Sequence, residues 1–246
     1  MANFAPVQRA SQSSYAAIRS LQGGLIVSCQ APIDSPLHEP SIIAAIAHAA
    51  VNQGAVGVRI DTPAHVQAVR QQISAPIIGL WKQQRAGFDV YITPQFRDAA
   101  AIATAGADII AIDATQRDRP QGETMASLID QIHRDLGKPV MADVDTLDAA
   151  IAAAAAGADL IGTTLYGYTA ATRHLSPPGF DLLSQILSHT TPELQIPLIC
   201  EGGIASPQMA QQAIALGADA VVVGTAITGI DLQVAAYRAA VRDAVG

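Results

Sequence analysis

Four Ala-rich stretches of the chain end in a Gly-Ala pair, and each is followed by a short, continuously apolar run. The glycines are Gly54, Gly106, Gly157 and Gly217. Glycine just past a helix end takes the left-handed conformation without steric cost, so each pair predicts the end of a helix. A short run that is apolar throughout is typical of a strand buried on both faces. The pattern therefore predicts strands at Val56–Ile60, Ile109–Ile112, Leu160–Thr164 and Ala220–Val223.

Four further apolar runs predict strands that interleave with these. Proline opens three of them, as is tolerated at the first position of a strand. Their ranges are Leu25–Cys29, Pro76–Trp81, Pro139–Ala142 and Pro197–Cys200.

Helix-start signals lie between the predicted strands. Thr62 and Ser206 each precede a proline, which places a capping residue before proline at the first helical position. Asp145 and Thr146 precede an Ala-rich segment that runs to Ala156, and we expect Asp145 to be a helix-start residue there.

Eight strands that alternate with helices over 246 residues predict a closed (β/α)8 barrel of the phosphate-binding type. The alternative is a doubly wound open sheet, which does not need eight evenly spread strands. We expect a single domain over residues 1–246, in which residues 1–12 are disordered and residues 13–22 form a leading helix.

Composition excludes several function classes. Half of the residues are hydrophobic and 14% are charged, so the chain is not disordered as a whole. A net charge of −7 and 4% aromatic residues argue against nucleic-acid binding. No apolar run reaches the roughly 18 residues of a membrane helix, and residues 1–20 lack the apolar region of a secretory signal. Two cysteines form no disulfide framework, so we expect a cytoplasmic protein.

Polar side chains follow the predicted strands where active sites of such barrels lie, at the carboxyl ends. Seven of the eight strand ends carry one, and the eighth carries Gly224. If Gln30 and Glu201 point into the barrel mouth, then Cys29 and Cys200 point outward and are buried, unreactive thiols. The seven polar residues are Gln30, Arg59, Lys82, Asp113, Asp143, Thr164 and Glu201.

Lys82 and Glu201 are the candidates for proton transfer. A lysine desolvated beside Arg59 would have a lowered pKa and would serve as a base near neutral pH. Glu201 would be its partner, as acid, base or orienting group. The alternatives are a solvated lysine at a loop start and a surface or capping carboxylate.

The last two strands are followed by glycines that predict a phosphate site, at Gly202-Gly203 and at Gly224-Thr225. Tight packing of the loops is the alternative. Asp143 should point inward as a substrate ligand, whereas Asp113 would either hold a substrate hydroxyl or brace its neighbours. The six histidines show no metal-ligand spacing, so no metal is expected. The segment from Gly167 to Gly179 has the hinge-like ends of a closing loop, and an ordinary surface loop is the alternative.

Six motifs together resemble the N-acetylmannosamine-6-phosphate 2-epimerases, from about Gly23 to Ile230. The motifs are GGLIVSCQA (23–31), IIAIDAT (109–115) with Arg119-Pro120, MAD (141–143), IGTTLYGYT (161–169), CEG (200–202) and VGTAIT (223–228).

The resemblance implies interconversion of N-acetylmannosamine 6-phosphate and N-acetylglucosamine 6-phosphate, a step of amino-sugar and sialic acid catabolism, without a cofactor. It implies that Lys82 and Glu201 are catalytic and that a homodimer forms. It also implies sugar binding by Gln30, Arg59 and Asp143, to which we add Thr164 and Tyr168.

One position departs from the family pattern. An arginine that reaches the phosphate commonly follows the last motif, and Gly229 stands there. Either another cation such as Arg173 substitutes, or the phosphate is held more weakly. Two alternatives therefore stay open: a barrel enzyme acting on another phosphorylated sugar, and a catalytically silent phosphosugar-binding protein.

Overall fold

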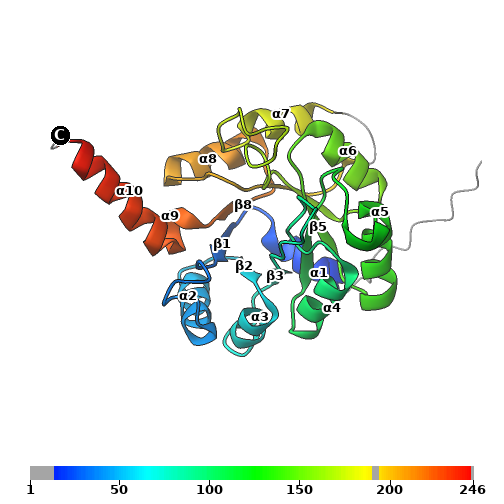
Figure 1. Ribbon diagram of the computed structural model, residues 1–246, viewed down its shortest axis with the longest axis horizontal. Coiled ribbons are helices and arrows are strands. Elements are labelled where there is room, and N and C mark those ends of the chain that lie inside the picture. The colour runs from blue at the N-terminus through cyan, green and yellow to red at the C-terminus, as the bar shows by residue number, and fades with distance from the viewer. Residues whose placement is uncertain (1–13, 190–193, 245–246) are drawn as a thin grey trace, which may run out of the picture.

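The computed structural model describes residues 14–189 and 194–244 and contains a closed parallel barrel (Figure 1). The strands are hydrogen-bonded in chain order, and β8 returns to β1 through the Leu25↔Val221 pairing. This closure confirms the predicted (β/α)8 barrel and excludes the open sheet. The strands are β1 (Leu25–Cys29), β2 (Gly57–Asp61), β3 (Ile77–Leu80), β4 (Ile109–Asp113), β5 (Val140–Asp143), β6 (Leu160–Gly162), β7 (Leu198–Cys200) and β8 (Ala220–Val223).

Helices surround the barrel (Figure 1). The α-helices are α1 (Ser14–Leu21), α2 (Pro40–Asn52), α3 (Pro63–Arg70), α4 (Phe96–Thr104), α5 (Met125–Gln131), α6 (Leu147–Ala155), α7 (Phe180–Ser188), α8 (Pro207–Leu216), α9 (Thr225–Thr228) and α10 (Ile230–Asp243). A 3₁₀ turn, η1 (Pro120–Gly122), and a π-helical turn, η2 (Ile132–Leu136), flank α5. The predicted leading helix is α1, whereas residues 1–12 lie outside the described residues.

A repeated aspartate explains how three strands begin. The aspartate that follows a Gly-Ala pair accepts a hydrogen bond from the first N–H of the preceding strand, as Asp108 does from Ile77 at 2.9 Å. Asp159 does so from Val140 and Asp219 from Leu198, both at 2.8 Å. The predicted prolines stand one residue before these strands. They lack an N–H, but their carbonyls still accept hydrogen bonds from the adjacent strand, as Pro76 does from Val58 at 3.0 Å.

The predicted helix starts are confirmed at Thr62 and Ser206, whose side chains accept hydrogen bonds from the backbone of His65 and Met209. At α6 the capping residue is Thr146 rather than Asp145. Asp145 instead accepts a 2.6 Å hydrogen bond from Thr169, so its carboxylate is directed away from the helix start. The glycines of the Gly-Ala pairs all have positive φ, from 95° to 112°, as predicted.

Two apolar layers build the core, one inside the barrel and one between strands and helices. Ile26, Leu80 and Met141 belong to the inner layer, and α1 closes its lower end with Ile18 and Leu21. Cys29 and Cys200 belong to the outer layer, which confirms that they point away from the mouth. Burial raises the pKa of the Cys29 thiol to about 12 and that of Cys200 to about 11, so both stay protonated and unreactive.

The helix after β8 departs from the expected pattern. α10 occupies the chain position of the eighth outer helix, yet none of its residues is buried. It extends away from the barrel instead of covering it (Figure 1). Its apolar side chains, including Val234 and Tyr237, are exposed, so the packing that holds the other outer helices to the strands is missing here.

Candidate active site

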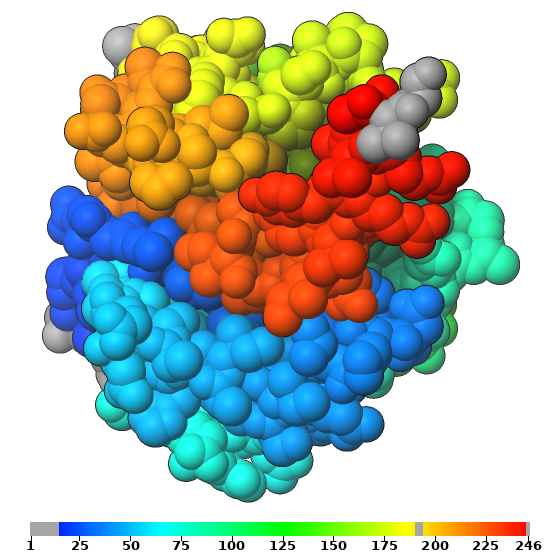
Figure 2. Space-filling view, turned by 90° about the vertical axis from the view of Figure 1, so that its left-hand side faces the viewer, coloured from blue at the N-terminus to red at the C-terminus, as the bar shows by residue number. Residues whose placement is uncertain are grey.

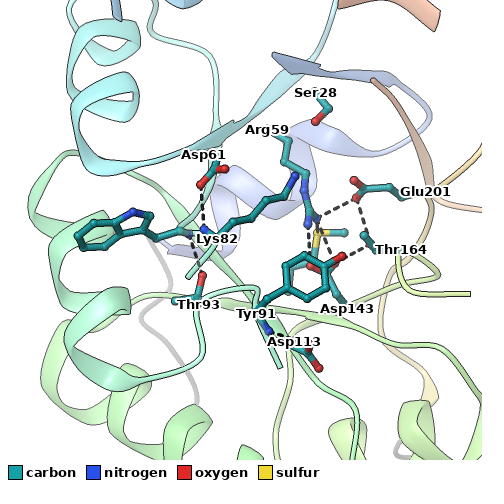
Figure 3. Close-up of polar contacts among 12 residues, drawn as sticks. Ser28, Arg59, Asp61, Lys82, Tyr91, Thr93, Asp113, Asp143, Thr164 and Glu201 are labelled. Atoms are coloured by element: carbon teal, nitrogen blue, oxygen red, sulfur yellow. Dashed lines mark hydrogen bonds and ion pairs between the residues drawn. The ribbon is translucent and has the colours of Figure 1, made fainter. Parts of the chain in front are cut away.

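The carboxyl ends of the strands bring the predicted polar residues together at one end of the barrel (Figure 3). Arg59 and Asp143 lie within β2 and β5, while Lys82 and Glu201 follow β3 and β7. Alternation along each strand places these side chains on the same side as the inner apolar layer. The mouth therefore carries two cations and two carboxylates above the inner apolar layer.

Arg59 is the centre of this cluster. Its guanidinium donates to both oxygens of Asp143, at 3.0 and 2.6 Å, and lies 2.8 Å from Oε2 of Glu201. The side chain is only 1% exposed. Burial by itself would lower the pKa of Arg59, but the two carboxylates raise it above its ordinary value, so Arg59 stays charged.

Glu201 has a strongly perturbed pKa of about 7. Burial is the main cause, and the charge of Asp143 raises the pKa further. Arg59, a hydrogen bond from Thr164 and the charge of Lys82 act in the opposite direction. Glu201 therefore populates both protonation states near neutral pH, as a general acid or base requires.

Lys82 is held at three points. Its ammonium donates to Oε1 of Gln30 at 2.6 Å, and its backbone N–H donates to Asp61 at 2.9 Å. The residue also forms an antiparallel bridge with Ile92. The residue is exposed, but its ammonium lies among protein atoms, and this desolvation, together with Arg59, lowers the pKa of Lys82. Asp61 acts in the opposite direction. The direction agrees with the prediction for a lysine base.

Gln30 and Thr164 link the charged groups. Gln30 accepts from Lys82 and donates to Oγ of Ser28 at 2.9 Å. The Thr164 hydroxyl lies 2.6 Å from Oδ1 of Asp143 and 3.2 Å from Oε2 of Glu201. These contacts orient the lysine and the two carboxylates.

Asp113 braces its neighbours. Its carboxylate accepts hydrogen bonds from the Thr115 hydroxyl at 2.7 Å and from Arg117 at 2.7 Å. A longer bond of 3.4 Å comes from the backbone of Tyr91. Of the two roles that the sequence leaves open, these contacts support bracing.

Two residues near the cluster escaped the sequence analysis. Asp61 follows Arg59 by two residues in β2, so alternation along the strand gives it the same inward direction. This spacing could have identified Asp61 from the sequence. Tyr91 lies in the connection after β3, where no strand end marks it. It reaches the cluster only because that connection folds back on itself, a feature that alternation along strands does not reveal.

The glycines after β7 and β8 lie at the same end of the barrel. Gly202 and Gly203 have φ of 97° and 71°, which favours glycine at both positions. A Cβ on Gly203 would approach Pro177 within 2.5 Å, and one on Gly224 would approach Ser28 within 3.3 Å. Packing therefore accounts for the lack of a side chain at Gly203. Thr225 is exposed at the start of α9.

The segment from Gly167 to Gly179 is tied to the barrel. The Thr169 hydroxyl bonds to Asp145, and the backbone of Gly167 donates to the Thr172 hydroxyl at 3.0 Å. These bonds favour a fixed loop over a closing one. Tyr168 stands on this segment and is 57% exposed. Gly229, where the family pattern has arginine, ends α9, and a Cβ there would meet Thr225 at 2.9 Å.

Within residues 14–189 and 194–244, no group of three or more histidine, cysteine, aspartate or glutamate residues is arranged to hold a metal ion. In the same part of the chain, no helix combines the length and apolar character needed to cross a membrane.

Comparison with known proteins gives consistent matches. The family model described as "Putative N-acetylmannosamine-6-phosphate epimerase" matches residues 43–243. A protein of Thermosynechococcus vestitus with the name "Putative N-acetylmannosamine-6-phosphate 2-epimerase" is 63% identical over 222 residues, covering 90% of this chain and 95% of that protein. A protein of the same name from Synechococcus elongatus is 63% identical over 89% of this chain and 94% of its own.

Solved structures agree with the sequence matches. The N-acetylmannosamine-6-phosphate 2-epimerase from Clostridium perfringens superposes with a TM-score of 0.84 at 35% identity, covering 91% of this chain and 95% of that chain. A thiamine phosphate pyrophosphorylase from Pyrococcus furiosus, with a TM-score of 0.54 at 17% identity over 85% of this chain and 88% of its own, shares the fold alone. The arrangement at the barrel mouth and these matches together show that the chain belongs to the N-acetylmannosamine-6-phosphate 2-epimerase family.

Proposed function

We propose that this protein is a cofactor-independent isomerase that interconverts N-acetylmannosamine 6-phosphate and N-acetylglucosamine 6-phosphate by moving a proton at C2. The observation that carries the proposal is the pairing of a lysine of lowered pKa with a buried glutamate of pKa about 7 around the same arginine. Two groups that titrate toward neutral pH from opposite sides are suited to reversible proton transfer. Membership of the epimerase family supports the identity of the substrate.

The reacting form is the open-chain aldehyde, because the C2 hydrogen is acidic only beside a carbonyl. In one direction neutral Lys82 removes the C2 proton, and the electrons of that bond form the C1=C2 double bond while those of the carbonyl pass to O1, which gives an enolate. The lysine ammonium that forms and nearby N–H donors stabilise the negative oxygen. The lowered pKa of Lys82 increases the neutral fraction that starts this step.

The opposite face of C2 must then receive a proton. Glu201 in its acid form supplies it, because its pKa of about 7 keeps a protonated population at neutral pH. The electrons return from O1, the aldehyde re-forms, and C2 is inverted. In the reverse direction Glu201 is the base and the Lys82 ammonium is the acid, and solvent resets both groups after each turnover.

Substrate binding is assigned to the groups around this pair. Gln30, Arg59, Asp143, Thr164 and Tyr168 would hold the sugar. Backbone N–H groups of Gly202, Gly203 and Gly224, with Thr225, would receive the phosphate. The adjacency of β7 and β8, through Cys200↔Val221, supports a phosphate bound by both loops together.

Proton NMR of N-acetylmannosamine 6-phosphate with the purified protein in deuterated water tests the proposal. We expect the C2 epimer to appear with deuterium at C2, because the hydrogen that Glu201 delivers comes from solvent and is not the one that Lys82 removed. An epimer that keeps its original proton would contradict delivery by Glu201. Binding with neither epimer nor exchange would identify a silent phosphosugar-binding protein. The absence of binding, epimer and exchange would direct the search to another phosphorylated sugar, with Gly229 as the first position to examine.

We also propose that the protein acts as a homodimer through α10. The exposed apolar side chains of this helix line a cavity of about 570 Å³ beside α9, on the face shown in Figure 2. α10 carries Asp231 near its start and Arg242 near its end, so two copies packed antiparallel would pair opposite charges. A twofold axis produces such an arrangement.

We further propose a cytoplasmic location, because a phosphorylated sugar does not cross a membrane unaided.

A further inference from the structure

The connection between β3 and α4 brings a tyrosine to the mouth that the proposed reaction does not use. The connection doubles back on itself, so that Lys82 bridges Ile92 and the backbone N–H of Gln83 donates to the Tyr91 carbonyl at 2.8 Å. Lys82 and Tyr91 therefore stand on the two arms of one small hairpin. The contacts that hold this hairpin therefore position both Lys82 and Tyr91.

Asp113 fixes the backbone of Tyr91. The Asp113 carboxylate accepts from the Tyr91 N–H at 3.4 Å, and its own N–H donates to the Ile92 carbonyl at 2.8 Å. Arg117 holds the same carboxylate at 2.7 Å. This bracing directs the ring across the mouth, where the hydroxyl points toward Asp143 and Thr164 (Figure 3).

The Tyr91 hydroxyl has no hydrogen-bond partner among residues 14–189 and 194–244, although its ring is half-buried. Polar groups in such positions are normally satisfied by protein, water or ligand. Burial and the charges of Asp143 and Asp113 raise the pKa of Tyr91 to about 12, while Arg59 and Arg117 act in the opposite direction. The phenol therefore stays protonated and is available as a donor, not as a base.

The donors at the mouth are few. The guanidinium of Arg59 makes three contacts with the carboxylates of Asp143 and Glu201, so those N–H groups are already used. The two carboxylates themselves accept hydrogen bonds. The carboxylates suit the sugar hydroxyls, which donate. An oxygen that only accepts needs a donor, and the carbonyl of the acylamido group is such an oxygen. That group is attached to C2, the carbon that Lys82 must reach.

We infer that Tyr91 is a substrate-contacting residue whose hydroxyl donates a hydrogen bond to the acylamido carbonyl oxygen and thereby favours N-acylated sugars. The inference rests on the proposed function, since it places C2 at Lys82. It follows from the shared hairpin, which sets the tyrosine beside the lysine, and from the unpartnered donor that points into the site.

The test compares wild type with Tyr91→Phe on two ligands. One is N-acetylmannosamine 6-phosphate as substrate, and the other is mannosamine 6-phosphate, which lacks the acyl carbonyl, as an inhibitor. We expect Tyr91→Phe to raise KM for the substrate roughly 3- to 10-fold, as for loss of one uncharged hydrogen bond. The inhibition constant of mannosamine 6-phosphate should stay within about 2-fold.

Two further variants complete the design. Tyr91→Leu removes the ring as well and should weaken both ligands, whereas Tyr15→Phe, at the opposite end of the barrel where the hydroxyl donates to Asp159, should change neither. Equal effects of Tyr91→Phe on the two ligands, or no effect on either, would overturn the inference while wild-type turnover still supported the epimerase. Absence of turnover in the wild type would instead overturn the proposed function.

Discussion

The guanidinium of Arg59 lies 2.8 Å from the carboxylate of Glu201, and both side chains are buried at the mouth of the barrel. This contact pulls the pKa of Glu201 down against the burial that raises it, and the balance leaves that pKa at about 7. The same arginine also pushes the pKa of Lys82 down. Arg59 thus lowers both pKa values, while burial raises that of Glu201 and lowers that of Lys82 and so moves the two toward each other.

Replacing the lysine tests the base. Lys82→Ala should lower kcat/KM by about 100- to 10,000-fold or more, because it removes the group that takes the C2 proton. Epimerisation followed by NMR measures the loss, and circular dichroism checks that the fold is retained. The chain contains one other lysine, Lys138, which precedes β5 at the opposite end of the barrel. Lys138→Ala is therefore the matched control, and near-normal activity of Lys82→Ala would refute the assignment.

Glu201 should produce a limb in the pH profile. In the direction where Glu201 is the acid, its protonated fraction falls as pH rises through about 7, so kcat/KM should decline above that pH. Glu201→Gln should lower the rate about 100-fold or more and flatten this limb. The experiment is a kcat/KM profile from pH 5 to about 9. A limb that persists in the variant would assign it to another group.

The charge of Asp143 should move that limb. Asp143 raises the pKa of Glu201, so Asp143→Asn should shift the limb to lower pH. A shift in the opposite direction, or none, would contradict the electrostatic explanation. Because Asp143 also pairs with the buried Arg59, the variant should lose up to about 3 kcal/mol of unfolding free energy, measurable by urea denaturation.

Asp159 should matter for stability alone. It lies at the far end of the barrel and accepts from Tyr15, His133 and the backbone of Val140, at 3.0, 2.8 and 2.8 Å. Asp159→Ala removes the acceptor of these three hydrogen bonds and should cost about 3 kcal/mol of unfolding free energy, with kcat/KM nearly unchanged. A large loss of activity in the folded variant would show that the two ends of the barrel are coupled.

The α10 interface predicts a change in oligomeric state. Val234 is 60% exposed on α10, and the proposed dimer buries it against the second copy. A charge at this position would be buried without a partner and would destabilise the dimer. Val234→Asp should therefore sediment as a monomer where the wild type sediments as a dimer. Leu187→Asp, at a 43% exposed position on α7, is the matched control and should leave association intact. A wild type that sediments as a monomer would refute the dimer.

Much of the molecule could be predicted from the order of residues because barrel strands impose a simple geometry. Apolar runs locate all eight strands within a residue or two of their observed limits. Alternation then directs Cys29 and Cys200 outward and Gln30 and Glu201 inward. These features depend on periodicity and on glycine at helix ends, both of which are local.

What the sequence by itself determined is therefore the barrel and the set of side chains that face its mouth. Only the tertiary structure decided that Arg59 joins Asp143 to Glu201, that Asp113 braces Tyr91, and that α10 leaves the barrel. Each of these depends on contacts between segments far apart in the chain. The pKa of Glu201 is the clearest case, because it is set by burial and by charges contributed from three other strands or their ends.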